Sequence, residues 1–351
     1  MTEWRIYQGV SEPHDGIGRL PAPPPWRDFS DGSSQVTEFD RDSHVGSGRR
    51  LPGADAYCAD ERTIEAVNTA LYLRRPLLVT GDPGVGKSTL ADAVARELKL
   101  GTVLRWPINS KTTLRDGLYR YDSLGRLEDA GVARSLAKKA HLPDTTAGEA
   151  PGFAMDLGRY VSLGPLGTAL APYELPRVLL IDEIDKSDID LPNDLLDAFE
   201  EGGFDIPELA RAADQHETVR VRPTDGGEPV QVVRGMVRCR AFPFVILTSN
   251  GEREFPPAFL RRCVRLQLPP VTQDDERLRA IVQAHLPDAA EHAEQVIAKF
   301  KEHAATGELA TDQLLNAVYL ICRTSTQGAP DLDGLVQLVF QHLNVTVPAT
   351  P

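Results

Sequence analysis

Cysteine is scarce in this chain of 351 residues, which contains four cysteines and eight histidines. No two of the cysteines form a C-x-x-C pair; they are Cys58, Cys239, Cys263 and Cys322. Such scattered positions indicate neither a disulfide framework nor a zinc site, and the histidines also lack the spacing of metal ligands. A fold stabilised by disulfides or by zinc is therefore not expected.

Long apolar runs and an excess of basic residues are also absent. No run approaches the roughly 18 apolar residues of a membrane span. The first ten residues, MTEWRIYQGV, lack the basic and apolar regions of a signal peptide. We therefore expect a cytoplasmic protein without a membrane span. The formal net charge of −13 weighs against a general nucleic-acid-coating role, although it leaves room for a local basic patch.

The first 50 residues differ in composition from the rest of the chain. They are rich in proline, glycine, serine and charged residues, as in LPAPPPWRDFSDGSSQ, and this composition disfavours a packed core. We expect residues 1–50 to form a poorly ordered arm. Its aromatic residues could anchor it on the body of the protein or on a partner; they include Trp4, Trp26 and Phe29.

From about residue 60 the sequence alternates between apolar runs and amphipathic stretches. Short apolar runs with β-branched residues predict strands buried on both faces. These runs lie at residues 76–80, 103–108, 178–182 and 242–250. Beyond Pro269 and Pro270 the pattern is helical, over residues 272–286, 288–305, 310–323 and 331–343. This order predicts an α/β fold, an αβα sandwich followed by a small all-helical domain, and the chain is long enough for both.

A glycine-rich stretch after the first predicted strand fits the pattern G-x-x-x-x-G-K-[ST]. The glycines allow a tight turn whose backbone N–H groups face phosphates, and the helix that follows adds its positive end. The lysine of the pattern should reach the β- and γ-phosphates, and the serine hydroxyl should ligate Mg²⁺. We expect a nucleotide site made by Gly81, Pro83, Gly84, Val85, Gly86, Lys87, Ser88 and Thr89.

A cluster of carboxylates ends the predicted strand in RVLLIDEIDKSD, residues 177–188. The carboxyl end of such a strand lies where open α/β sheets bind ligands. Asp182 is placed to hold Mg²⁺ through its water shell, and Glu183 can orient and deprotonate an attacking water. A kinase has no need of that glutamate, so the pair favours hydrolysis. The sequence also lacks the NKxD stretch typical of GTPases and the LSGGQ stretch typical of ABC transporter subunits.

These motifs, in this order, resemble those of an AAA+ ATPase, and within that superfamily the chain resembles the bacterial MoxR branch. The resemblance covers at least residues 57–323. It rests on the P-loop, the LLIDEID segment, Asn250 at the end of a strand and the arginine pair in PPAFLRRC. It implies an AAA+ core at residues 51–268, with a helix-2 insert and a hairpin before Asn250. A helical lid at residues 269–351 would follow.

The resemblance also implies a role for each matching residue. The Walker A and Walker B residues would be Lys87, Ser88, Asp182 and Glu183. Asn250 matches sensor 1, which helps to place the lytic water, and Arg262 aligns with the arginine finger that enters the site of the adjacent subunit. Arg261, beside it, stays an alternative for that role. Tyr57 lies where the family often places its adenine pocket, although packing against a core is the commoner role of such a tyrosine.

By the same resemblance, we expect Mg²⁺-dependent ATP hydrolysis by a ring, usually a hexamer, that remodels a client protein. MoxR-type ATPases often act beside proteins with a von Willebrand factor A domain. One departure from the family is the lack of a sensor 2 arginine around residues 309–313, since Arg323 lies too late in that predicted helix. This departure leaves open a second hypothesis, an ATP-gated assembly switch in a bacterial conflict or defence system.

An arginine-rich segment before Asn250 leaves a third hypothesis open. The stretches VRVRP and VVRGMVRCR flank TDGG, which predicts a hairpin of two strands. Alternation would put Arg220 and Arg222 on one strand face. On the other strand, one face would carry Arg234, Arg238 and Arg240. Such a basic hairpin could grip a nucleic-acid backbone or an acidic protein segment, although a solvated hairpin face is the more common explanation.

Overall fold

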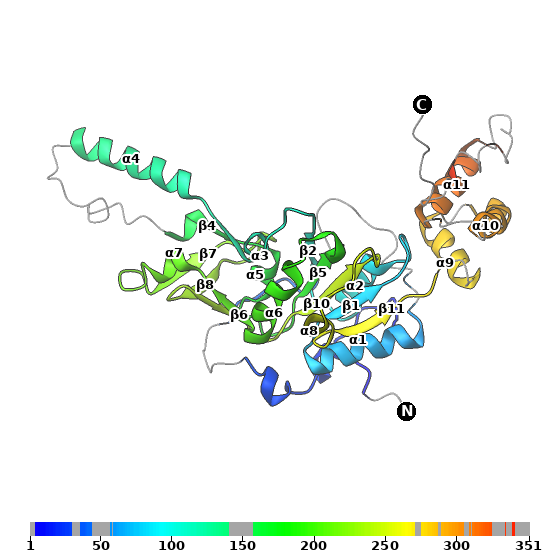
Figure 1. The fold of residues 1–351 in the computed structure, drawn as a ribbon, viewed down its shortest axis with the longest axis horizontal. Coiled ribbons are helices and arrows are strands. Elements are labelled where there is room, and N and C mark those ends of the chain that lie inside the picture. Colours follow the sequence, from blue (N-terminus) through cyan, green and yellow to red (C-terminus); the bar gives the residue numbers. More distant parts are fainter. Residues whose placement is uncertain are drawn as a thin grey trace.

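A computed structural model describes residues 4–29, 36–43, 57, 59–139, 157–270, 275–286, 289–304, 309, 311–324, 334, 339 and 340. In Figure 1, helix α4 (Ser123–Lys139) projects from one end of the molecule. The other end is formed by α9 (Asp275–His285), α10 (Ala290–Ala304) and α11 (Thr311–Thr324). No helix in the described part of the chain is long and apolar enough to cross a membrane.

Five parallel strands form the central sheet in the order β11-β1-β10-β5-β2. Their bounds are β1 (Leu77–Thr80), β2 (Leu104–Pro107), β5 (Val178–Asp182), β10 (Phe244–Ser249) and β11 (Val264–Gln267). All six residues of β10 are buried, as expected of a strand covered on both faces. Thr80 pairs with Ser249, so the polar segments that follow these strands meet at one edge of the sheet.

Alternate residues of the central strands contribute to two hydrophobic cores, one on each face of the sheet. Leu77 and Val79 belong to a core that includes apolar residues of α1 and α2, whereas Leu78 belongs to a core that includes α5 and α6. This arrangement confirms the predicted αβα sandwich. The helices around the sheet are α1 (Glu61–Leu73), α2 (Lys87–Glu97), α3 (Leu114–Leu118), α5 (Pro165–Ala169), α6 (Leu191–Glu201) and α8 (Pro257–Leu260).

Two small antiparallel sheets and several short helices complete the core. One sheet has the order β6-β9-β8-β7, with bounds β6 (Gly203–Asp205), β7 (Thr218–Val221), β8 (Val230–Val233) and β9 (Met236–Arg238). The other pairs β3 (Tyr119–Tyr121) with β4 (Val161–Leu163), on either side of α4 in the chain. The short helices are α7 (Pro207–Ala210), η1 (Gly16–Arg19), η2 (Pro25–Arg27), η4 (Leu157–Tyr160) and η5 (Ile184–Lys186).

The arginine-rich segment contains the antiparallel pair that the predicted hairpin requires, β7 with β8 on either side of TDGG, but its second stretch is divided into two strands. Its second half turns at Arg234 and Gly235, whose φ angles of 52° and 81° lie in the left-handed region. This tight turn separates β8 from β9, which pair antiparallel. Arg234 therefore lies in the turn and Arg238 in β9, so the prediction that Arg234, Arg238 and Arg240 share one face of one strand was wrong.

The first residues of the chain lie against the core, which differs from the predicted poorly ordered arm. Ile6 and Ile17 are 0% and 3% exposed and belong to the core that holds α1 and α2. The Oδ1 of Asn68, on α1, accepts hydrogen bonds from the backbone N–H groups of Ile6 and Tyr7, at 2.7 and 3.0 Å. Glu97, on α2, accepts from two further arm N–H groups. The prediction of disorder was wrong for residues 4–29. In this segment Asn68 and Glu97 accept backbone N–H groups that would otherwise need a partner strand.

The helices that follow β11 pack on one another through apolar residues such as Phe300 and Leu314. The predicted helices at 272–286, 288–305 and 310–323 correspond to α9, α10 and α11 and are confirmed within the described residues. The predicted fourth helix, 331–343, lies outside the described residues except at positions 334, 339 and 340. The boundaries between the predicted domains stay predictions.

Candidate functional site

The glycine-rich turn between β1 and α2 forms the base of the site. Gly81 and Gly86 have φ angles of 151° and 92°, which other residues rarely adopt. A Cβ atom on Gly81 would lie 3.0 Å from the carbonyl oxygen of Leu268, so the turn also packs tightly against the segment after β11. Gly86 is the N-cap of α2 and supplies no side-chain cap, which leaves the first N–H groups of the helix available to an anion.

Lys87 joins this turn to the end of β10. Its Nζ donates hydrogen bonds to the carbonyl oxygens of Gly81 (2.6 Å) and Asp82 (2.9 Å), and to Oδ1 of Asn250 (2.6 Å). The lysine is 8% exposed, and burial lowers its pKa, while Asp185 and other nearby carboxylates act in the opposite direction. The structure thus brings together two predicted site residues that are 163 positions apart in the chain.

A second set of hydrogen bonds centres on Asp182, at the end of β5. Its Oδ1 accepts from the hydroxyl groups of Ser88 (2.7 Å) and Thr248 (2.6 Å). Oxygen ligands of this kind are those that Mg²⁺ prefers, so the serine and aspartate predicted as the metal residues fit that ion. Thr248 was missed by the sequence analysis, although a polar residue two positions before Asn250 in an apolar strand is a usable signal.

Glu183 follows Asp182 in the chain, but its carboxylate pairs with Lys186. Its backbone is in the left-handed region, with φ 61° and ψ 50°, which is uncommon for a residue other than glycine. Its N–H donates to the Thr248 hydroxyl at 2.9 Å, which holds this strained turn in place. The carboxylate forms an ion pair with Lys186 at 2.8 Å and is 43% exposed. A base at this position can therefore be reached by water.

Asp185 ties the Walker B turn to the loop after β10, and the sequence analysis did not assign it a role. Its Oδ2 accepts from the backbone N–H groups of Asn250 (2.9 Å) and Glu252 (3.2 Å). The residue is 3% exposed, and its Oδ1 is buried without a hydrogen-bond partner among the described residues. The side-chain amide of Asn250 contacts Lys87. Asp185 therefore helps to hold that amide beside the glycine-rich turn, through its hydrogen bond to the backbone of Asn250.

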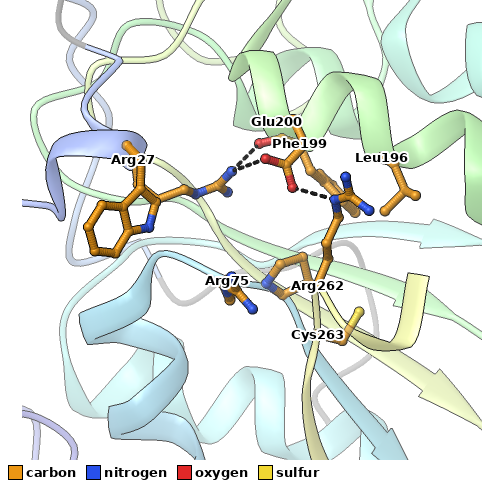
Figure 2. Close-up of a pocket in the computed structure, with 9 residues that line it drawn as sticks. Arg27, Arg75, Leu196, Phe199, Glu200, Arg262 and Cys263 are labelled. Atoms are coloured by element: carbon orange, nitrogen blue, oxygen red, sulfur yellow. Dashed lines mark hydrogen bonds and ion pairs between the residues drawn. The ribbon is translucent and has the colours of Figure 1, made fainter. Parts of the chain in front are cut away.

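Arg261 and Arg262 are not brought to this site within the chain. They precede β11, whose first residue pairs with Leu77 at the start of β1, so they lie at the amino ends of the strands. The four residues of β1 alone span about 13 Å toward the opposite, carboxyl edge, where the glycine-rich turn lies. Arg262 instead donates from Nε to Glu200 at 2.8 Å (Figure 2). It also donates from Nη1 to the carbonyl oxygen of Ala258 at 3.2 Å.

One residue from the helical segment also reaches the turn. Arg277, on α9, donates from Nη2 to the carbonyl oxygen of Val85 at 3.1 Å. Tyr57 lies on the same side, since its ring would be 3.3 Å from a Cβ atom placed on Gly86. Arg277 was missed by the sequence analysis, which searched for a lid arginine only near α11.

The strand order, the glycine-rich turn and the carboxylates at the strand ends define a P-loop nucleotide-binding core. Residues 76–263 match the family model of the AAA domain, dynein-related subfamily. Since the match covers more than half of the chain, the protein belongs to this AAA family. No curated protein matches the chain.

Two solved structures are among those similar to this chain. PCH-2 of C. elegans is 14% identical with a TM-score of 0.34, and the match covers 76% of this chain and 60% of that one. The FIGL-1 AAA domain, in complex with ADP, is also 14% identical with a TM-score of 0.34, and the match covers 78% of this chain and 74% of that one. This chain therefore spans less than two thirds of the PCH-2 chain.

Proposed function

We propose that the protein is a MoxR-like, Mg²⁺-dependent ATPase that assembles into a ring and uses ATP hydrolysis to remodel a partner protein. The proposal rests on one observation above all. Lys87 contacts Asn250, and Ser88 contacts Asp182, so four residues from three separate motifs meet at the edge of one sheet. Family membership supports nucleotide binding and ATPase activity in general, and the further details are ours.

Phosphate binding would use groups that already converge on the turn. The N–H groups of the turn and of the first residues of α2 would face the β- and γ-phosphates, and the Lys87 ammonium would exchange its carbonyl acceptors for phosphate oxygens. Ser88 and Asp182 would hold Mg²⁺, the aspartate through a water. When bound, this ion offsets the charge of the phosphate oxygens.

Hydrolysis would need a positioned water and a base. Asn250 would orient the water that attacks the γ-phosphorus, and Glu183 would accept its proton as the bond to the β-phosphate oxygen breaks. The products are ADP and inorganic phosphate. For this role the Glu183 carboxylate must exchange its ion pair with Lys186 for the water.

The position of Arg262 supports the proposed ring. This arginine lies at the opposite end of the sheet from Lys87, so it can offset charge on a γ-phosphate only in the site of another chain. Arg262 would be the finger, as the resemblance implies, and the ring would be a hexamer. The client would be a protein, with a von Willebrand factor A domain protein as the expected partner class.

The first test is steady-state ATP hydrolysis by the full chain with Mg²⁺ over a wide range of protein concentration. We expect activity per chain to rise with concentration and then saturate, as sites are completed between subunits. Glu183→Gln should bind ATP but lower turnover by roughly 10²- to 10⁴-fold. The matched control is Glu254→Gln, an exposed carboxylate in the loop after β10. Wild-type turnover in the Glu183 variant would remove this residue from the mechanism.

The ATP-gated switch is a second candidate, and one contact favours it. The ion pair between Glu183 and Lys186 occupies the catalytic base, as it would in a state that binds ATP and waits for a signal. Binding and assembly without measurable turnover, both with and without protein partners, would support it. The nucleic-acid motor has less support, because Arg234 and Arg240 form ion pairs with Asp214 and Glu174 rather than a shared basic face.

A further inference from the structure

The N-terminal arm places a buried cation close to the proposed finger. Arg27, in η2, is 5% exposed and lies against the neighbouring rings of Phe29 and Phe242, with its Cζ 5.0 and 4.5 Å from their centroids. Its guanidinium donates to the carbonyl oxygen of Arg74 from Nε and Nη2, at 3.1 and 2.8 Å. It also donates from Nη1 to the carbonyl oxygen of Phe199, at 2.8 Å. The arm is therefore attached to the core through this side chain.

The two carbonyl groups belong to the ends of two helices. Arg74 is the C-cap of α1, and Phe199 lies in the last turn of α6. Carbonyl groups at such positions have no partner within their helix and carry the negative end of its dipole. A single buried cation therefore bridges one carbonyl group at the end of α1 and one in the last turn of α6.

Glu200, the next residue of α6, links this cation to Arg262. Figure 2 shows Glu200 between the two arginines. One carboxylate oxygen, Oε2, lies 3.7 Å from Nη1 of Arg27, and the other, Oε1, accepts from Nε of Arg262 at 2.8 Å. The carboxylate is thus shared by a buried cation and an exposed one, and the arm reaches Arg262 through a single intermediate residue.

The contacts of Arg262 leave several of its N–H donors available to an anion. Its Nε and one Nη1 hydrogen are used by Glu200 and by the carbonyl oxygen of Ala258, and the side chain is 40% exposed. A guanidinium has five N–H donors, so three of them stay free of these two contacts. Holding an arginine at Nε fixes the plane in which its remaining donors can meet a phosphate.

We propose that Arg27 is a positioning residue for ATP hydrolysis, which sets the pose of Arg262 through Glu200 so that this finger fits the neighbouring subunit's γ-phosphate. This inference rests on the proposed ring ATPase. It assigns a function to the N-terminal arm: docking of the arm on one chain controls turnover in the site of the next. A partner that pulled residues 25–27 away from α6 would lower hydrolysis without touching the nucleotide.

The test uses mixed rings of full-length chains. Arg27→Met should lower turnover by roughly 10- to 100-fold with little change in nucleotide affinity. Mixing it with Lys87→Ala chains, which have an intact finger but no phosphate lysine, should restore turnover at the Arg27→Met sites. Arg5→Met is the matched control, because Arg5 also lies in the arm but pairs with Glu61, away from the finger. It should behave as the wild type.

Two further variants separate positioning from simple damage to the fold. Glu200→Gln should lower turnover like Arg27→Met while leaving α6 intact, and Arg27→Lys should recover part of the loss. The double variant Arg27→Met/Arg262→Ala should be no slower than Arg262→Ala alone, because both changes remove one finger. A merely structural role for Arg27 would instead add its loss to that of Arg262.

The outcomes distinguish the two levels of proposal. If Arg262→Ala chains are not rescued by Lys87→Ala chains, the finger does not act between subunits and the ring mechanism fails, together with this inference. If Arg262→Ala chains are rescued but Arg27→Met chains are not, the ring mechanism stands and the role of Arg27 is overturned. Wild-type turnover in both Arg27→Met and Glu200→Gln would overturn that role as well.

Discussion

The two ends of the central sheet differ in how their polar residues are satisfied. At the carboxyl ends of the strands, Lys87, Asp182 and Asn250 are bonded to groups of the same chain. At the amino ends, Arg262 is 40% exposed, and its two hydrogen bonds leave three of its N–H donors available. Under the proposed function, each chain carries the binding half of one site and the charge-stabilising half of another. Substitutions at the two ends should therefore change different quantities.

The largest expected effect is on turnover, at the amino end. Arg262→Ala should lower the turnover rate by about 10³- to 10⁵-fold, the usual contribution of an arginine finger, with unchanged nucleotide affinity. Single-turnover hydrolysis and equilibrium binding of a fluorescent nucleotide would measure the two quantities separately.

Arg261→Ala provides the matched control for that experiment. Arg261 is exposed, and its backbone carbonyl accepts from Arg75 whatever its side chain is, so we expect turnover within about twofold of the wild type. The reverse result is a large loss in Arg261→Ala and none in Arg262→Ala. It would assign the finger role to Arg261, and the contact between Arg262 and Glu200 would then have no part in hydrolysis.

The next effect is on affinity, at the carboxyl end. Lys87→Ala removes a buried ammonium that would pair with phosphate, which should weaken ATP binding by roughly 2–5 kcal/mol, or about 30- to 4,000-fold. Calorimetric titration with a non-hydrolysable ATP analogue would measure this loss. Lys99→Ala, beyond the opposite end of α2 and paired with Asp15, should bind ATP as the wild type does. Equal affinities in Lys87→Ala and the wild type would show that nucleotide binds elsewhere.

A smaller effect is expected from the residue that supports the carboxyl end. Asp185→Ala leaves the N–H groups of Asn250 and Glu252 without their acceptor, so the amide of Asn250 should lose its fixed position. We expect turnover to fall roughly 10- to 100-fold, or about 1.4–2.8 kcal/mol in activation free energy. Asp185→Asn keeps an oxygen acceptor and should recover most of that loss, whereas equal losses in both variants would indicate that the charge of Asp185 matters instead.

The carboxyl end was the more predictable of the two. Lys87, Ser88 and Asp182 stand in short contiguous patterns whose chemistry requires those residue types, and their strands are recognisable as apolar runs. The parallel sheet brings the ends of these strands together, so their proximity follows from the strand assignment alone. Asp185 was missed because it acts on backbone N–H groups, which leave no pattern in the sequence, whereas Thr248 could have been found as a polar residue in an apolar strand.

The amino end and the arm depend on contacts that composition does not reveal. The Pro-rich segment was expected to be poorly ordered because it has few apolar residues. Its backbone is nevertheless held by Asn68 and Glu97, and the buried Arg27 bridges carbonyl groups at the ends of two helices. Acceptors on distant helices decide whether such a segment docks, and nothing in the spacing of the arm itself indicates them.

The smallest expected effect concerns the attachment of the arm. Asn68 is fully buried on α1, accepts from the N–H groups of Ile6 and Tyr7, and donates to the carbonyl oxygen of Tyr7. In Asn68→Ala these arm groups lose their partner, which should lower the free energy of unfolding by roughly 1–3 kcal/mol. Chemical denaturation would measure this loss, and faster tryptic cleavage at the exposed Arg19 would report release of the arm.

Thr69→Ala is the control for the arm experiment, because the Thr69 hydroxyl bonds only to the carbonyl oxygen of Glu65 within the same helix. It should leave cleavage at Arg19 unchanged. If Asn68→Ala releases the arm and also lowers turnover, while nucleotide affinity stays constant, then the arm belongs functionally to the amino end of the sheet. Release of the arm with full turnover would instead separate arm docking from Arg262 and would confine the arm to a structural role.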